Sequence, residues 1–513
     1  MYINNKILIG KNKDKEMAIL LDKANRHGLI TGASGSGKTI TLKVMAESFS
    51  AAGVPVFLAD VKGDIAGTCM PGENSEKIKE RLANLEIEDF KFKGFPIHFW
   101  DVFGKKGHPI RTTVKDVGPN ILSRMLGLTE AGEGVLAIAF KIAEDKNLEL
   151  IDLKDLKILL TYLGVHYKEF ITTYGNITTQ SIGVIQRSLL QLESQGGNYF
   201  FGEPNLDIND FLKTNQEGLG FINIMDCVEL FKSPDLYACF LLWLLTTLYN
   251  TLPEVGDLDK PKIVFFFDEA HLLFDDMPSY MLKEVTQIVK LIRSKGIGLY
   301  FISQAPTDIP DAIISQLGNR VQHTLRAYTP AEEKTVKVAA SAFRTNPEFN
   351  TEDAIKSLGT GEALISFQNE KGEPTVVEKC TILPPQSMMG SIDDSTRLMV
   401  MNNSLFKGKY DIINDRESAY EKLTEELENE QKEKELAEKI KEEEKAKKEA
   451  EKEAARQLKE EEKQKKAEEK AKREREKALK SSAGYKLGKK VVNKTIDKAL
   501  NKGINRVLKS LFK

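Results

Sequence analysis

The sequence predicts an α/β fold in which a mostly parallel sheet is sandwiched by helices. Up to about residue 385, short apolar runs rich in β-formers alternate with helical patterns, which is typical of a parallel sheet covered on both faces. Several runs end in Asp or Gln, and polar groups at the carboxyl ends of parallel strands are where open α/β sheets bind ligands. The expected strands are His27–Thr31, Val54–Asp60, Pro96–Asp101, Gly220–Asp226, Lys262–Asp268, Gly298–Gln304, Arg320–Ala327 and Glu362–Gln368.

The alternation is interrupted between about residues 116 and 195. Helical patterns such as GEGVLAIAFKIAED and DLKDLKILLTYLG occur there without a strand-like run. We therefore expect an α-helical insertion within a core domain of residues 1–390. Residues 391–420 are polar and are predicted to link this core to the C-terminal part of the chain.

Residues 421–480 form a run of Glu, Lys and Arg with very few apolar residues. Glu and Lys recur at separations of three and four, which favours a solvated single helix. Disorder is the alternative for such a composition. A coiled coil is less expected, because the apolar residues of the run do not sustain a heptad. They are Leu423, Leu427, Leu436, Ile440 and Leu458.

The tail, residues 481–513, contains a basic amphipathic pattern. Its apolar residues from Val492 to Leu511 fall on one helical stripe, with Lys and Arg elsewhere. Such a helix can dock on a protein partner or a neighbouring subunit, lie on an anionic membrane, or contact nucleic acid. The sequence leaves these three alternatives open.

Charge is distributed unevenly along the chain. Residues 421–480 balance 20 Lys/Arg against 21 Glu, residues 481–513 carry nine against one Asp, and residues 1–420 therefore carry nine net negative charges. An acidic core argues against a broad basic face for nucleic acid, although a narrow basic channel stays compatible. The four cysteines are widely spaced, and neither a signal peptide nor a long apolar span is visible. We expect a soluble, cytoplasmic protein.

A glycine-rich loop follows the first strong strand, and its residues are Gly32, Ala33, Ser34, Gly35, Ser36, Gly37, Lys38 and Thr39. It lies between the strand HGLIT and the helical pattern TLKVMAESFSAAG, which is the context of a phosphate-binding loop. The glycines let backbone N–H groups face phosphate oxygens, and the helix N-terminus adds positive potential. Lys38 would bridge the β- and γ-phosphates, and Thr39 would supply a hydroxyl to Mg²⁺. We assign the loop and the following Ile40 to binding ATP.

Two carboxylates follow the apolar strand KIVFFF. Strand alternation points Asp268 and Glu269 in different directions, so one can face a metal and the other a water. We assign Asp268 to Mg²⁺ and Glu269 to orienting and deprotonating the attacking water. Alternatively, the two acids have no catalytic role and only stabilise the N-terminus of the following helix electrostatically.

Other strand ends carry weaker signals. Gln304 ends a strand expected beside the phosphate loop, where an amide can sense the γ-phosphate. Asp60 ends another strand just before Lys62. A functional role for Asp60 and a structural role in forming the turn are equally compatible with this position. His271 starts a helix just after the acidic pair, and a capping or core role is favoured over catalysis. The six histidines are scattered, so no further metal site is expected.

Taken together, GASGSGKT, FFFDEAHLLF, LIRSKGIGLYFISQAP and LGNRVQHTLRAYTP resemble the HerA/FtsK superfamily of ring ATPases. More closely, they are similar to the bacterial HerA-like helicase C-terminal family of YjgR-like proteins. The similarity also takes in GVPVFLADVKGD, FFGEP, LLWLLTTLYNTLPEVGDLDKPK and NPEF, so it covers about residues 5–385.

The resemblance implies a RecA-like P-loop core, a homo-hexameric ring, ATP at subunit interfaces and translocation of double-stranded DNA. It also implies that Gln304 is the γ-phosphate sensor. The superfamily has an arginine finger, for which Arg293 and Arg320 are the candidates in this chain. An arginine that reaches across an interface would stabilise transition-state charge.

Two other functions stay open. The acidic core and the unusual C-terminus are compatible with an ATP-driven assembly or remodelling module acting on a protein or membrane partner. A nucleotide-dependent switch that hydrolyses slowly is a third hypothesis, which Glu269 makes less favoured.

Overall fold

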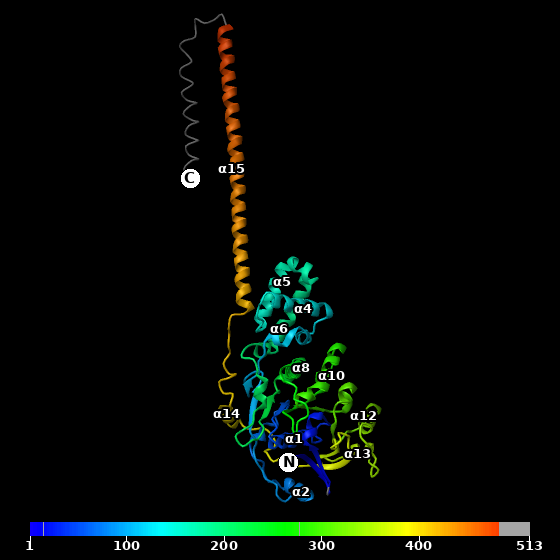
Figure 1. Cartoon of the computed structure of the whole chain (residues 1–513). Helices are drawn as coiled ribbons and strands as arrows, with labels where there is room; N and C mark the ends of the chain where they lie inside the picture. Colours follow the sequence, from blue (N-terminus) through cyan, green and yellow to red (C-terminus); the bar gives the residue numbers. More distant parts are fainter. Residues whose placement is uncertain (14, 276, 482–513) are drawn as a thin grey trace. The chain divides into compact units, whose positions relative to one another are not determined.

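The computed structural model describes residues 1–13, 15–275 and 277–481. The chain divides into two compact units, one spanning Met1–Glu425 and one beginning at Glu426. The first unit holds the sheet, its covering helices and the helical insertion (Figure 1).

The phosphate loop leaves from the middle of one large mixed sheet. β4 (Gly28–Thr31) lies between β10 (Ile297–Ser303) and β11 (Asn319–Gln322) and is parallel to both. β9 (Ile263–Phe267) runs parallel to β10 on its other side. Beyond β9 the order continues through β5 (Val56–Asp60), β8 (Ile222–Asp226), β6 (Ile97–Asp101) and β7 (His108–Pro109). The carboxyl ends of β4, β10 and β9 therefore meet at one edge.

Antiparallel strands complete the sheet beyond β11. They are β12 (Glu362–Ser366), β13 (Glu378–Ile382), β2 (Lys6–Asn12), β1 (Tyr2–Ile3) and β3 (Lys15–Leu20). All the strands expected from the sequence are present, but the one expected at Arg320–Ala327 already ends at Gln322. Sequence reasoning missed β1, β2, β3, β7 and β13.

The core of the first unit lies on both faces of the parallel strands. Phe49 of α1 (Lys38–Ala51) packs on one face against Phe266 and Tyr300, with ring centroids 6.4 and 6.1 Å apart. Alternation along the strands turns Phe57 to the other face, where its ring lies 5.1 Å from that of Phe211. A strand buried on both faces reads as a continuous apolar run, which is why these strands could be predicted.

The other helices of the core have the following bounds: α2 (Glu76–Asn84), α7 (Gly197–Phe200), α8 (Pro234–Thr251), α9 (His271–Phe274), α10 (Ser279–Leu291), α11 (Asp311–Ile314), α12 (Pro330–Ser341), α13 (Thr351–Ser357) and α14 (Asp394–Asn402). Of these, α8 is buried along most of its length. It begins near the carboxylates that follow β9, because Tyr237 in its first turn contacts Asp268.

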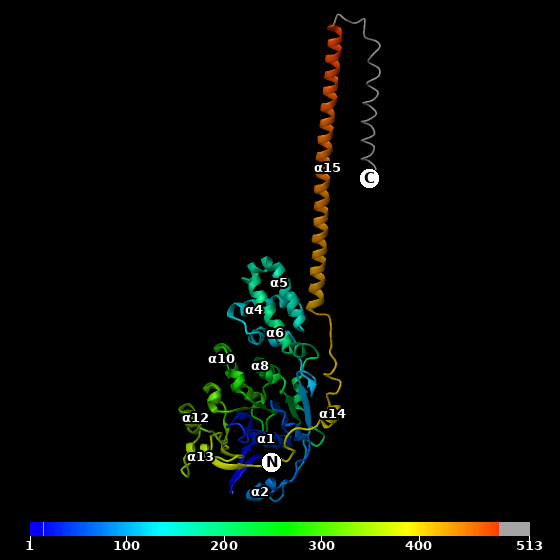
Figure 2. The same cartoon turned by 180° about the vertical axis from the view of Figure 1, so that it is seen from behind.

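The predicted helical insertion consists of α3 (Val114–Met125), α4 (Glu130–Asp145), α5 (Leu153–Tyr174) and α6 (Thr179–Ser194). Figures 1 and 2 show α4, α5 and α6 packed side by side. Asp152 caps α5 in a capping box with Asp155, which satisfies N–H groups at the helix start.

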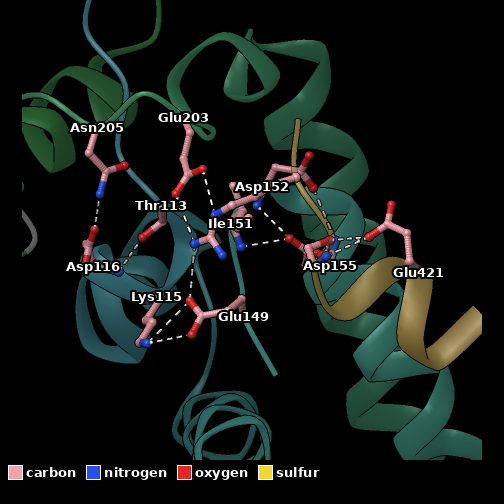
Figure 3. A network of polar contacts seen from close by, with 12 residues as sticks. Thr113, Lys115, Asp116, Glu149, Ile151, Asp152, Asp155, Glu203, Asn205 and Glu421 are labelled. Atoms are coloured by element: carbon pink, nitrogen blue, oxygen red, sulfur yellow. Dashed lines mark hydrogen bonds and ion pairs between the residues drawn. The ribbon is translucent and has the colours of Figure 1, made fainter. Parts of the chain in front are cut away.

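Residues 391–425 pack on the core through several anchors. Arg397 of α14 donates to Lys106 O at 3.0 Å, and Tyr410 donates from its hydroxyl to Asp210 at 2.5 Å. Figure 3 shows the last anchor, where buried Asp155 in the first turn of α5 lies near Glu421. Its carboxylate accepts from Tyr420 N at 2.8 Å. The segment predicted as a linker is therefore attached along its length.

The charged arm is a single helix, α15 (Ala419–Ser481), of 63 residues. At 1.5 Å per residue it extends about 95 Å. Leu436, Ile440 and Leu458 on this helix are exposed. The helix is therefore stabilised by Glu and Lys side chains three or four residues apart and not by a buried apolar seam. The tail predicted to be amphipathic begins at residue 481 and otherwise lies outside the described residues.

The α/β class, the mostly parallel sheet, the helical insertion and the helical arm are confirmed. Among the helices that the structure describes, none is long and apolar enough to cross a membrane.

Candidate nucleotide site

The glycine-rich loop connects β4 to α1 through backbone conformations that favour glycine. Gly35 and Gly37 have φ angles of 75° and 114°, in the left-handed region that side chains disfavour. A Cβ on Gly37 would also lie only 3.2 Å from Gly361 N. The loop is thus a backbone cradle at the N-terminus of α1, the arrangement that binds anions.

Lys38 lies inside this cradle. Its ammonium donates to Gly32 O at 2.5 Å and to Ala33 O at 3.2 Å. Burial, and then the charge of Lys62, lowers the pKa of Lys38, while Glu269 and Asp268 oppose the shift. The structure therefore brings the predicted lysine and the predicted acid pair into one electrostatic environment.

The acid pair follows β9 in a tight turn that three hydrogen bonds fix. Tyr237 donates from its hydroxyl to Asp268 O at 2.6 Å, Glu269 N donates to Asp268 Oδ1 at 2.9 Å, and Ala270 N donates to Ile302 O at 2.9 Å. Glu269 has a φ of 48°, which is uncommon for a residue with a side chain. Such strain persists where the surroundings impose it, and it clusters at functional sites.

Burial raises the pKa of Asp268 to about 6, and repulsion from Glu269 adds to the shift. Lys62 and Lys38 act in the opposite direction. Only 9% of Asp268 is exposed, so its carboxylate is poorly solvated and close to like charge. A cation at this position would remove both penalties.

His271 lies beside Glu269. The Glu269 Oε2 and His271 Nδ1 atoms are 3.5 Å apart, and both are buried without a hydrogen-bond partner among the described residues. The sequence favoured a capping or core role for His271. The structure instead places its ring against the carboxylate assigned to the attacking water.

Gln304 follows β10 directly beside the loop. Its carbonyl oxygen accepts from Gly32 N at 3.2 Å, while its side chain is exposed. This fits the expected neighbourhood of Gln304 and the phosphate loop, and its role as sensor stays a prediction. Asp60 has the turn-forming role, because its carboxylate accepts from Gly63 N at 2.7 Å and from Ile65 N at 3.1 Å.

The two candidate finger arginines lie away from the site. Arg293 belongs to a 3₁₀ turn that precedes the amino end of β10, and seven residues of strand separate it from the carboxyl edge, about 23 Å. The guanidinium of Arg320 donates to the carbonyls of Leu317, Ala342 and Ile314 at 3.0–3.3 Å. Neither arginine meets Lys38 within one chain, and the choice between them stays a prediction.

Sequence reasoning did not assign a role to Lys62, whose charge acts on both Lys38 and Asp268. Its position just after a strand end was the available signal. Sequence reasoning also missed Tyr237. Its hydroxyl donates to the carbonyl of Asp268, 31 residues away, and no local pattern indicates such a contact. No group of three or more His, Cys, Asp or Glu in the described residues could hold a metal ion.

A glycine cradle with a buried lysine lies at the same sheet edge as two carboxylates, with one parallel strand between the strands that carry them. This arrangement defines a P-loop ATPase. The chain belongs to the family described as helicase HerA-like C-terminal, whose sequence model matches residues 5–510.

Similar proteins include two that are each called DNA double-strand break repair helicase HerA. The one from Sulfolobus acidocaldarius is 23% identical over 393 residues, which cover 72% of this chain and 68% of the relative. The one from Sulfurisphaera tokodaii is 24% identical over 387 residues, covering 71% of this chain and 67% of the relative.

Two solved structures are also similar. VirB4 of Thermoanaerobacter pseudethanolicus is 16% identical with a TM-score of 0.46, over 75% of this chain and 97% of that structure. The plasmid coupling protein TrwB in complex with ADP and Mg²⁺ is 13% identical with a TM-score of 0.46, over 72% and 88%.

Proposed function

We propose that this chain hydrolyses ATP with Mg²⁺ and uses the energy to translocate double-stranded DNA through a homo-hexameric ring. The observation that carries the proposal is that Lys38 in the glycine cradle and the pair Asp268–Glu269 after β9 lie at one sheet edge, close enough for their charges to act on one another. A motor needs these groups on one terminal phosphate, and β10 alone separates the strands that present them.

The residues present fit a nucleotide with its metal. The cradle offers N–H groups, and the buried Ser36 Oγ and Glu269 Oε2 have no hydrogen-bond partner among the described residues. Thr39 and Asp268 supply the hard oxygen donors that Mg²⁺ prefers. When bound, Mg²⁺ would neutralise charge on the β- and γ-phosphates.

Each side chain then has one task in the proposed reaction. Lys38 moves from the loop carbonyls to the terminal phosphates, where its charge offsets theirs. Glu269 orients the attacking water and accepts its proton. Gln304 senses the γ-phosphate from the neighbouring strand end. The fixed turn around Glu269 holds this carboxylate without reorganisation, which favours catalysis.

Arg293 is the arginine that we propose to act across a subunit interface. Arg293 lies too far along β10 from the carboxyl edge to reach the nucleotide site of its own chain. The guanidinium of Arg320 is already bound to three backbone carbonyls. An arginine finger is worth about 10³-fold or more in hydrolysis. Arg293→Ala should therefore bind ATP and lose turnover, whereas Arg320→Ala should mainly destabilise the fold.

Mixing two inactive variants tests the interface. A Lys38→Ala subunit keeps its finger and an Arg293→Ala subunit keeps its cradle, so a mixture should recover part of the hydrolysis that each lacks. Normal hydrolysis by Arg293→Ala alone would show that Arg293 is not the finger, and so would the absence of any recovery when the two inactive variants are mixed.

The DNA part of the proposal is supported by family membership and by relatives named as DNA repair helicases. Its test is ATP hydrolysis measured with no DNA, single-stranded DNA and double-stranded DNA at low salt, with Lys38→Ala as the blank. Strong stimulation by duplex DNA is expected. Equal rates of hydrolysis at all DNA concentrations would contradict translocation on DNA, although the chain would still be an ATPase.

A second function is favoured by one observation, the long exposed helix α15 that continues from an anchored start. An assembly or remodelling ATPase could present this arm (421–480) and the tail (481–513) to a protein or an anionic membrane, with the core (1–390) and its connecting segment (391–420) supplying the energy. We propose a cytoplasmic location in either case. Deletion of residues 426–513 is the test, and unchanged localisation and partner recovery in cells would exclude this alternative.

A further inference from the structure

A cavity of about 310 Å³ adjoins the phosphate loop and extends past it. Thr39 and Ile40 in the first turn of α1 line one side. Distant parts of the chain also contribute to the lining, namely Thr360 and the pair Met389–Gly390. The cavity is a recess beside the phosphate loop that the sugar and base of a bound nucleotide could enter.

The segment that carries Met389, residues 384–390, is here called the strap. The buried carboxylate of Glu47 in α1 holds it from one side. Glu47 accepts from Gln386 N at 2.7 Å, from Ser387 N at 3.2 Å, and from the Ser387 hydroxyl. Hydrogen bonds to a charged acceptor are about twice as strong as neutral ones.

A second buried charge holds the same segment. Lys43 lies one helical turn before Glu47, and its ammonium donates to Met388 O. On the other side of the strap, Gly67 N donates to Gly390 O at 2.9 Å, and Met388 N donates to Met70 O at 2.8 Å. Moving the strap would take from the buried Lys43 and Glu47 the hydrogen bonds that they make to it, which is strongly unfavourable. The strap is therefore a fixed wall.

The Thr360 side of the cavity is fixed as well. Arg81 of α2 donates to Thr360 O at 3.2 Å and to Ile382 O at 3.1 Å. Gly361 N donates to Ser36 O at 3.1 Å, which joins this turn directly to the phosphate loop. The rigid surroundings leave Met389 as an apolar side chain that is 50% exposed beside the cavity.

We propose that the strap forms the nucleobase subsite and that Met389 packs on the face of the base. This inference rests on the proposed function of the phosphate loop. A thioether makes favourable contacts with aromatic rings, and the base is the only aromatic part of the nucleotide. The buried pair Lys43 and Glu47 thereby acquires a role, because it holds the subsite at a constant distance from the cradle.

The experiment compares two ligands of the full-length chain, ATP with Mg²⁺ and inorganic tripolyphosphate with Mg²⁺. Met389→Ala should raise the Kd for ATP about five-fold, the size expected from a lost sulfur–aromatic contact, and should leave the Kd for tripolyphosphate unchanged. Met389→Leu keeps the volume but removes the sulfur, so its Kd for ATP should lie between those of the wild type and Met389→Ala. Met399→Ala is the matched control, because Met399 is 56% exposed on α14.

The outcomes separate this inference from the proposed function. An unchanged Kd for ATP in Met389→Ala, or an equal loss for both ligands, would overturn the base contact while leaving the phosphate site intact. Absence of binding by both ligands to the wild type would overturn the proposed function and the subsite together.

Discussion

Removing the charge of Asp268 should stabilise the free protein while abolishing its activity. The carboxyl has an ordinary pKa of 3.8 and a pKa of about 6 in the folded chain. Because the folded state holds the proton more tightly, stability is highest below pH 3.8 and falls as the pH rises through 6. The difference corresponds to about 3 kcal/mol of lost stability above pH 7. Asp268→Asn is neutral at every pH and should regain it.

The pH dependence makes the prediction specific. The gain from Asp268→Asn should be about 3 kcal/mol at pH 8 and about half of that at pH 5, where the folded wild-type carboxyl is mostly protonated. Asn can still accept from Glu269 N, so the turn should keep its hydrogen bond. Magnesium-dependent ATP hydrolysis should be lost at both pH values.

Urea unfolding without nucleotide measures the effect. The chain has two tryptophans, Trp100 and Trp243, and both are buried in the first unit, so their fluorescence reports its unfolding. Asp257→Asn, at an exposed position before β9, is the control for removing one negative charge. The reasoning is refuted if Asp268→Asn gains no stability, if its gain does not change with pH, or if Asp257→Asn gains as much.

The remaining predictions concern the reaction. Lys38→Ala should weaken ATP binding and abolish turnover, as measured by nucleotide titration and phosphate release; retained turnover would remove the lysine from the mechanism. Glu269→Gln should bind ATP and stall, and a turnover close to that of the wild type would favour the slow-switch hypothesis. Tyr237→Phe removes the donor to Asp268 O and should lower kcat about ten-fold without changing KM, because a misplaced catalytic group costs rate more than binding. Tyr300→Phe is its control, since this buried hydroxyl donates to Ala24 O at 3.0 Å away from the site; an equal fall in kcat there would mean a general loss of stability.

Contiguous patterns made much of the site predictable. The phosphate loop needs glycines and a lysine at fixed spacing between a strand and a helix, and the acid pair needs an apolar strand before it. The relation between them follows from parallel strands ending at one edge. Thus Lys38, Asp268 and Gln304 could be placed near one another from their strands alone. Local sequence carries this kind of information because each group is positioned by its own strand end.

Contacts between distant segments were not predictable in the same way. The strap contacts α1 across more than 330 residues of sequence, through Glu47 and Ser387. Two charges one turn apart on an apolar helix were a signal of buried partners, but not of which partners. Likewise the antiparallel pairing of β13 with β2 depends on strands from opposite ends of the core. Short strands with exposed residues, such as β1, carry little hydrophobic pattern.

The features of the proposed nucleotide site also weaken the protein without nucleotide. Asp268 is buried with a raised pKa, Glu269 has a left-handed backbone, and Lys38 is desolvated among carbonyls. A triphosphate supplies the negative charge that Lys38 and Lys62 lack, and its metal supplies the positive charge that the acid pair lacks. Nucleotide binding therefore relieves both the repulsion within the acid pair and the unfavourable desolvation of Lys38 and Asp268. Hydrolysis restores part of both penalties. The charges of such a site balance only when the ligand is bound, so the nucleotide state changes the conformational free energy of the protein. A motor requires this coupling. Asp268→Asn should lose the coupling and gain stability.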